Sequence, residues 1–239
     1  MAADKCSVFV NHVDPAIFSR RTRTRDDGKV ILLFPGTFQP HQGLDVAIRA
    51  LGRLRTKVPN CEIHLYGGGG GRSSRADLAQ LASELGLNGR VRFFDSVPLD
   101  NIPELMANAD VGVVPKRADG FGNEAYSTKI MEFMSQGIPV VASRTAVDCH
   151  YFSDETVCFF KSGDDEAMAD VLLRLIEDRE LRGRMSRNGL EYAARNGWDS
   201  KKAEYLALVD DLCMERFQSA GATDVQPGER RIAPRGDPR

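Results

Sequence analysis

Between residues 29 and 163, short apolar runs alternate with amphipathic segments, and this alternation restricts the chain to few folds. Runs rich in Val, Ile, Leu and Phe predict strands over 30–34, 62–66, 91–94, 111–114, 138–142 and 156–160. Amphipathic segments between them predict helices over 44–55, 75–85, 102–107 and 128–136. Buried strands flanked by helices are typical of a parallel sheet covered on both faces. The pattern therefore predicts an α/β fold: one doubly wound, Rossmann-like domain with a parallel sheet of about six strands.

The two ends of the chain differ from this alternating region. We interpret 1–28 as a leading segment and linker, with a brief helix ending near Phe18 and a solvated basic loop over 20–29 that has no assigned function. After Gly163 the pattern is helical only, which predicts helices over 164–177, 180–195 and 199–217. The last residues are poor in apolar side chains and rich in Pro and Gly. The expected division is therefore 1–28, a domain over 29–218, and a disordered tail over 219–239.

Composition gives no indication of nucleic acid or an anionic membrane as the main partner, and the charge balance excludes little else. The net charge is −2 with acids and bases interleaved, so nothing indicates nucleic acid as a partner. No apolar run approaches the roughly 20 residues of a membrane span, and the start lacks the apolar core of a signal peptide, so a cytoplasmic location is expected. Five cysteines without C-x-x-C spacing argue against a disulfide framework or a zinc site. We expect reduced thiols, mostly buried.

The stretch 120–141 combines a polar loop, a helix over 128–136 and a buried strand. At helical spacing, Thr128, Lys129 and Glu132 fall on a polar side, whereas Ile130 and its apolar neighbours cover the other. Ser127 is expected to cap the first turn. The helix would then present unpaired backbone N–H groups and its positive dipole end to the loop, as an anion site does.

Three other strand ends are candidate ligand sites, because ligands of open parallel sheets bind beyond the carboxyl ends of the strands. The turn over 35–43 has glycines for close backbone approach, but it also fits an ordinary connection. The glycine run over 67–71 fits G-x-G-x-x-G poorly, which favours either a loop near a ligand or a connector without a role over a dinucleotide site. The strand end at 94–98 could receive a flat base or simply start a helix at Pro98.

Glu124 and Glu132 lie eight positions apart in the 120–141 stretch. As exposed side chains, with Lys129 beside Glu132, they would contribute only tenths of a kcal/mol to stability. As hydrogen-bond acceptors from sugar hydroxyls, each carboxylate could contribute about 1.5–3 kcal/mol to binding. The residues alone leave both readings open.

From about residue 4 to 209, the chain resembles the C-terminal, donor-binding half of family 4 retaining glycosyltransferases of GT-B architecture. The motifs occur in order along the chain: V-F-V-N-H-V-D-P-A-I-F, P-G-T-F-Q-P-H-Q-G-L-D, R-V-R-F-F-D-S-V-P, A-D-V-G-V-V-P, the E-x7-E pair of Glu124 and Glu132, and S-Q-G-I-P-V-V-A-S. The resemblance implies one half of a two-domain enzyme that acts on a nucleoside-diphosphate sugar.

The resemblance also implies roles for individual residues. Glu132 would hydrogen-bond the ribose hydroxyls, and Glu124 would contact the sugar ring. The base would lie against Asp95 and Val97. The diphosphate would lie against the amides around Ser127 and Thr128, with Lys129, and against the first turn through Gly36, Thr37, His41 and Gln42. Neither a metal nor a cofactor is implied, because helix ends and cations neutralise the leaving diphosphate.

The chain departs from the family pattern in its first turn. The family often has Gly-Arg and Lys-Gly where this chain has Gly36-Thr37 and Gln42-Gly43, so two cations are absent. His41, if protonated, or Lys129 would supply the charge instead. The G-F-G motif also lies farther from Glu132 than is usual in the family, which leaves the role of Glu124 less defined.

The resemblance begins almost at residue 1, so the N-terminal acceptor-binding domain is expected to be supplied in cis or in trans. The predicted function is the donor-binding part of a glycosyltransferase of bacterial polysaccharide or glycan biosynthesis, inactive in isolation, with Glu124 and Lys129 as the catalytic candidates. Peripheral membrane association would come through the partner domain. Two alternatives stay open: a non-catalytic nucleotide-sugar-binding or interaction module, motivated by Thr37 and Gln42, and a nucleotide-sugar epimerase.

Overall fold

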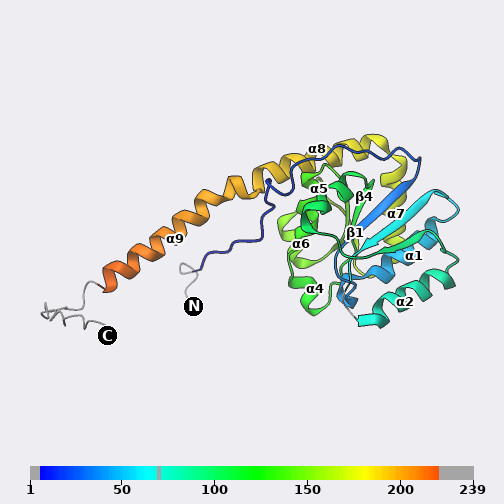
Figure 1. The fold of residues 1–239 in the computed structure, drawn as a ribbon, viewed down its shortest axis with the longest axis horizontal. Helices are drawn as coiled ribbons and strands as arrows, with labels where there is room; N and C mark the ends of the chain where they lie inside the picture. The colour runs from blue at the N-terminus through cyan, green and yellow to red at the C-terminus, as the bar shows by residue number, and fades with distance from the viewer. Residues whose placement is uncertain (1–5, 69–70, 221–239) are drawn as a thin grey trace, which may run out of the picture. The chain divides into compact units, whose positions relative to one another are not determined.

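A six-stranded parallel sheet forms the centre of the chain in the computed structural model, which describes residues 6–68 and 71–220 (Figure 1). The strand order is β3-β2-β1-β4-β5-β6. The strands are β1 (Val30–Pro35), β2 (Cys61–Tyr66), β3 (Val91–Phe94), β4 (Val111–Val114), β5 (Val140–Arg144) and β6 (Cys158–Lys161). All five neighbouring pairs are parallel. The predicted doubly wound α/β class is therefore confirmed.

Strand β1 lies at the point where the direction of winding reverses, between β2 and β4. Leu32 pairs with Ile63 of β2 on one side and with Val111 of β4 on the other. In a doubly wound sheet, the loops that leave the two halves separate at this point and open a crevice at the carboxyl ends of the strands. The loops after β1 and β4 are thus placed to hold a ligand.

One face of the sheet is covered by α1 (Leu44–Leu54), α2 (Gly71–Glu84) and α7 (Asp165–Glu177) (Figure 1). The strand side chains on this face include Leu32, Phe34 and Ile63, all fully buried. Burial of apolar side chains at about 25 cal/mol per Å² is the main stabilising contribution to such a layer. Because α1 and α7 both lie on this face, the loop after β1 is anchored to a well-packed layer.

The opposite face is covered by α3 (Ile102–Ala107), α5 (Thr128–Ser135) and α8 (Arg179–Asn196). Phe133 of α5 is fully buried over Gly112 of β4, where a Cβ atom would come within 2.5 Å of the aromatic ring. Similarly, a Cβ at Gly189 of α8 would lie 3.1 Å from Met134. The absence of side chains at these two glycines lets α5 pack closely between the sheet and α8.

Residues 20–29 form an irregular, largely exposed segment, as expected for a loop, but it is fastened to the domain. Arg25 and Arg23 pair with Asp110 at 2.5 and 2.7 Å, and Asp110 also accepts the backbone N–H of Ile31. Gln136, at the end of α5, donates to the carbonyl of Phe18 and accepts from the N–H of Arg21. The expectation of a freely solvated basic loop is therefore wrong for these arginines, since Asp110 lies within reach.

Several local predictions differ from the structure. The brief helix before Phe18 is only a hydrogen-bonded turn after Asp14. Short helices occur at positions read as loops or left without a prediction: η2 (Pro40–Gln42), η3 (Leu99–Asn101), α4 (Gly120–Glu124) and α6 (Ala146–Tyr151). They are too short to show a helical period. The expected burial of most cysteines is also wrong, because Cys6, Cys149 and Cys213 are exposed, although all five are unpaired.

The C-terminal region contains α9 (Trp198–Ala220), as predicted. Within the described residues, the part of α9 from Lys202 onward forms a unit separate from the domain that ends at Lys201. The disordered tail expected over 219–239 lies almost wholly outside the described residues. No helix in the described part of the chain is long and apolar enough to cross a membrane.

Candidate functional site

A cavity of about 330 Å³ opens at the carboxyl ends of β1, β2 and β3, beside the first turn of α5. Its lining combines backbone-rich glycine loops, one cation, one carboxylate and a few apolar side chains. The lining residues are Pro35, Gly36, Thr37, Tyr66, Gly67, Gly68, Ser96, Val97, Leu99, Ile102, Thr128, Lys129 and Glu132. The cavity lies where the topology of the sheet predicts a ligand.

The floor of the cavity is formed by the loops after β1 and β2, which continue the pairing of the sheet. The N–H of Gly36 donates to the carbonyl of Tyr66 at 2.8 Å, and that of Phe38 donates to Gly68 at 3.3 Å. A Cβ atom at Gly67, whose φ is 140°, would lie 1.9 Å from the carbonyl oxygen of Gly36. Only glycine allows this approach and this φ. The glycine run after β2 thus has a defined role at Gly67 and Gly68, whereas Gly69 and Gly70 lie outside the described residues.

The first turn of α5 forms one wall of the cavity. Ser127 precedes the helix, but the expected cap is wrong, because its side chain makes no capping hydrogen bond. Its hydroxyl instead donates to the buried carboxylate of Asp148 at 2.9 Å. Within the described residues, no hydrogen bond involves the backbone N–H of Thr128 or Lys129. The helix therefore presents two unpaired donors and its positive dipole end to the cavity.

Lys129 and Glu132 add opposite charges to this wall. The ammonium of Lys129 lies 5.2 Å from the centre of the Phe34 ring and makes no ion pair or hydrogen bond within the described chain. Burial lowers the pKa of Lys129, and the nearby Glu132 partly offsets the effect. Burial raises the pKa of Glu132, and Lys129 together with a hydrogen bond from Thr128 opposes this shift. Partly buried charges whose pKa values are shifted by burial are common in binding sites.

The other end of the cavity is less polar. Tyr66, which lines the cavity together with Leu99 and Ile102, stacks on Phe94 with ring centroids 4.3 Å apart. Ser96 and Val97, between β3 and η3, also line the cavity, so their backbone polar groups lie near this end. A flat apolar surface with backbone polar groups is suited to an aromatic base, whereas the α5 end is suited to an anion.

The predicted site residues divide into two groups. Those that line the cavity together are Gly36, Thr37, Val97, Thr128, Lys129 and Glu132. Those that do not line it are His41, Gln42, Asp95, Glu124 and Ser127. Ser127 is turned into the protein by its bond to Asp148. Asp95 is 94% exposed and pairs with Arg75 at 3.0 Å.

The remaining three residues outside the cavity lie on neighbouring loops. The side-chain amide of Gln42 contacts Nε2 of His41 at 3.0 Å, and the His41 ring packs edge-on against Phe121. Glu124 ends α4 and accepts a hydrogen bond from the Asn123 side chain at 2.9 Å. In this structure, none of these side chains contributes charge to the cavity wall.

Sequence reasoning missed the apolar lining residues Tyr66, Leu99 and Ile102 and the buried carboxylate of Asp148. Tyr66 ends a strand, so its position at the carboxyl edge could have been a signal. Asp148 follows Thr145 by three residues, a spacing typical of a capping box. Within the described chain, no group of three or more His, Cys, Asp or Glu side chains could hold a metal ion.

The sheet order and the position of the cavity define a Rossmann-like α/β domain with a cavity at the carboxyl edge of its sheet. The sequence pattern of the family "Glycosyl transferases group 1" matches residues 17–192, well over half of the chain. The chain therefore belongs to the group 1 glycosyltransferase family, and the resemblance seen in the motifs is confirmed. The chain is 30% identical over 185 residues to a D-inositol 3-phosphate glycosyltransferase of Corynebacterium glutamicum, an alignment that covers 76% of this chain and 43% of that relative.

Solved structures share the fold. The C-terminal domain of a group 1 glycosyl transferase, LpcC of Francisella tularensis, superposes with a TM-score of 0.64 at 21% identity, covering 76% of this chain and 96% of that one. Anabaena HepE in complex with UDP gives a TM-score of 0.69 at 21% identity, covering 77% of this chain and 49% of that one. The chain spans about half the length of the curated relatives that it matches.

Proposed function

We propose that this chain is the donor-binding half of a retaining glycosyltransferase, which holds a nucleoside-diphosphate sugar in the cavity at the carboxyl edge of the sheet. One observation carries the proposal. The unpaired N–H groups of Thr128 and Lys129, together with the Lys129 ammonium, converge on a cavity large enough for a ligand. Backbone donors, a helix dipole and a cation are the groups that bind a diphosphate.

The cavity divides between the parts of such a donor. The diphosphate is assigned to the first turn of α5, and the ribose hydroxyls to the carboxylate of Glu132, four positions farther along the same helix face than Thr128. The base is assigned to the Tyr66 end, against the backbone of Ser96 and Val97. HepE, which shares the fold, is described in complex with UDP, which supports a nucleotide as the ligand.

In the proposed reaction, the bond from the anomeric carbon to the diphosphate oxygen breaks, and its electron pair stays on the diphosphate. A new bond forms to an acceptor hydroxyl oxygen, whose proton leaves with the diphosphate. Lys129 and the α5 amides would stabilise the negative charge that develops on the leaving group, an effect that can lower the barrier by several kcal/mol. Glu124 lies outside the cavity lining, so we assign it at most a contact with the sugar beyond the cavity mouth.

The acceptor is assigned to a second domain, in cis or in trans. The support is that relatives are about twice as long as the aligned region, and that the C-terminal domain of LpcC superposes over 76% of this chain. We propose that the chain alone binds the donor without transferring its sugar, that it acts in the cytoplasm, and that any peripheral membrane association comes through the second domain.

Isothermal titration calorimetry with UDP, GDP and ADP and their sugars tests the proposal. One base series is expected to bind, and Glu132→Ala is expected to weaken binding at least about tenfold, the effect of one lost charge-assisted hydrogen bond. Glu177→Ala, the same change on an exposed position of α7, is the control and should leave affinity unchanged. Absence of binding by the whole panel, or an unaltered affinity in Glu132→Ala, would rule the proposal out.

A further inference from the structure

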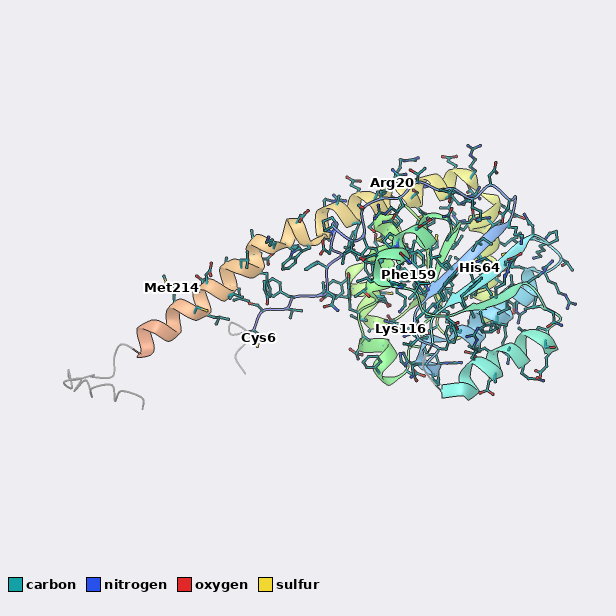
Figure 2. The ribbon with its side chains drawn as sticks, viewed as in Figure 1. Cys6, Arg20, His64, Lys116, Phe159 and Met214 are labelled. Carbon is teal, nitrogen blue, oxygen red and sulfur yellow. The ribbon has the colours of Figure 1, made fainter. Side chains whose placement is uncertain are left out.

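A buried ion pair lies beneath the loop that joins α4 to α5. Lys116, labelled in Figure 2, follows β4 in the chain, and Asp148 lies in the first turn of α6. The Lys116 ammonium is 2.9 Å from Oδ2 of Asp148. The two residues are only 4% and 1% exposed. Neither was identified from the sequence, and neither lines the cavity.

Both carboxylate oxygens of Asp148 accept hydrogen bonds from neighbouring groups. Oδ2 accepts the hydroxyls of Ser127 and Thr145, each at 2.9 Å, in addition to the Lys116 ammonium. Oδ1 accepts the backbone N–H of Ser127 at 3.1 Å. A charged pair persists at such burial only where its hydrogen-bonding groups are satisfied, as they are here.

The pair holds the loop before α5 at two points. Lys116 donates to the carbonyl of Ala125, and Asp148 accepts both the N–H and the hydroxyl of Ser127. These hydrogen bonds therefore fix Ala125 and Ser127, the residues on either side of Tyr126, directly before the helix. Because the Ser127 hydroxyl is held by Asp148, it is not available to cap Thr128 or Lys129.

We propose that Asp148, paired with Lys116, is a positioning residue for the diphosphate: it fixes the loop over 125–127 and withdraws the Ser127 hydroxyl, so that the first amides of α5 stay open to the ligand. This inference rests on the proposed donor site. Asp148 lies outside the cavity and should affect only the binding of the diphosphate. The base end of the cavity is formed by other loops, after β2 and β3.

The test compares two ligands, the nucleoside diphosphate that binds best among UDP, GDP and ADP and the nucleoside with the same base. Calorimetry measures the first and ligand-observed NMR the second. In Asp148→Asn, one acceptor oxygen is lost and Lys116 is left unpaired, so diphosphate affinity is expected to fall about tenfold or more while nucleoside affinity stays within about twofold. Equal losses for both ligands, or an unchanged diphosphate affinity, would overturn the inference.

Two further variants keep the test decisive. Lys116→Met combined with Asp148→Asn removes both charges, so no unpaired charge stays buried, and the same selective loss of diphosphate affinity is expected. Asp164→Asn makes the same change at the N-cap of α7, away from the cavity, and should alter neither affinity. A wild-type chain that binds neither ligand would contradict the proposed function itself, whereas a wild-type chain that binds the diphosphate no better than Asp148→Asn does would contradict only this inference.

Discussion

Lys129 lies in the cavity wall. Its ammonium makes no ion pair with a carboxylate of the described chain. Burial holds its pKa below the ordinary lysine value of 10.5, and Lys116 adds to this effect, whereas Glu132 and Asp148 oppose it. A bound diphosphate would raise the pKa of Lys129 again, because opposite charges favour the protonated form. Binding should therefore take up a proton at alkaline pH.

This coupling predicts the pH dependence of binding. Affinity for the nucleoside diphosphate should be greatest while Lys129 is protonated and should fall as pH rises through its lowered pKa, which lies below the ordinary lysine value. Lys129→Met should weaken binding at neutral pH about tenfold or more and should flatten the pH profile. Lys161→Met, at the exposed end of β6, should retain the wild-type profile. An equally steep profile in Lys129→Met would show that another group titrates.

A second residue-scale prediction concerns Ser127, whose hydroxyl points to Asp148. Ser127→Ala should cost about 1 kcal/mol of unfolding free energy, because one buried hydrogen bond is lost. Its affinity for the diphosphate should stay within about twofold, since the hydroxyl does not line the cavity. Thermal denaturation and calorimetry on the same sample measure both quantities. A large loss of affinity without a loss of stability would place the hydroxyl on the ligand instead.

At this scale, the sequence predicted what depends on local periodicity. Thr128, Lys129 and Glu132 share one side of α5 because of the helical repeat, and all three line the cavity. The direction of Ser127 depends on Asp148, which is 21 positions away and contacts it only in the folded chain. Similarly, Asp95 was placed near the site by its position at a strand end, but Arg75 holds its side chain at the surface.

At the scale of elements, the position of α5 depends on the missing side chain at Gly112. A Cβ atom there would lie 2.5 Å from the ring of Phe133. Either the strand backbone or the buried ring would have to move to relieve this clash. Gly112→Ala should therefore lower the unfolding free energy by about 1–3 kcal/mol and weaken diphosphate binding, since α5 carries the site. Gly183→Ala, inside α8 with only an arginine tip nearby, should be neutral or stabilising by up to about 1 kcal/mol.

Denaturant unfolding of both glycine variants measures this difference. A stable Gly112→Ala variant with unaltered affinity would mean that α5 tolerates displacement.

The elements themselves were largely predictable, since each strand was expected within two residues of its observed start. The short α4 and α6 were not, because their formation depends on contacts with neighbouring loops, such as the bond from the N–H of Ala146 to the side chain of Asn123.

At the scale of the whole molecule, the order of strands and helices was enough to predict the sheet, and parallel winding then brings the loops after β1, β2 and β3 to one edge. The depth of the cavity cannot be predicted from the order of the strands and helices. That depends on the approach of Gly67 to Gly36 and on the stack of Tyr66 with Phe94, which follow from packing.

We propose, above all, that a nucleoside diphosphate binds to the first turn of α5. The most direct measurement is amide chemical-shift mapping of the isotopically labelled chain by NMR during titration with the nucleoside diphosphate that binds best. The largest shifts are expected at the amides of Thr128 and Lys129, with smaller shifts at Gly36 and Val97, because unpaired N–H groups respond most strongly to a new anionic acceptor. Shifts confined to other surfaces, or unmoved amides at Thr128 and Lys129 under saturating ligand, would contradict the account.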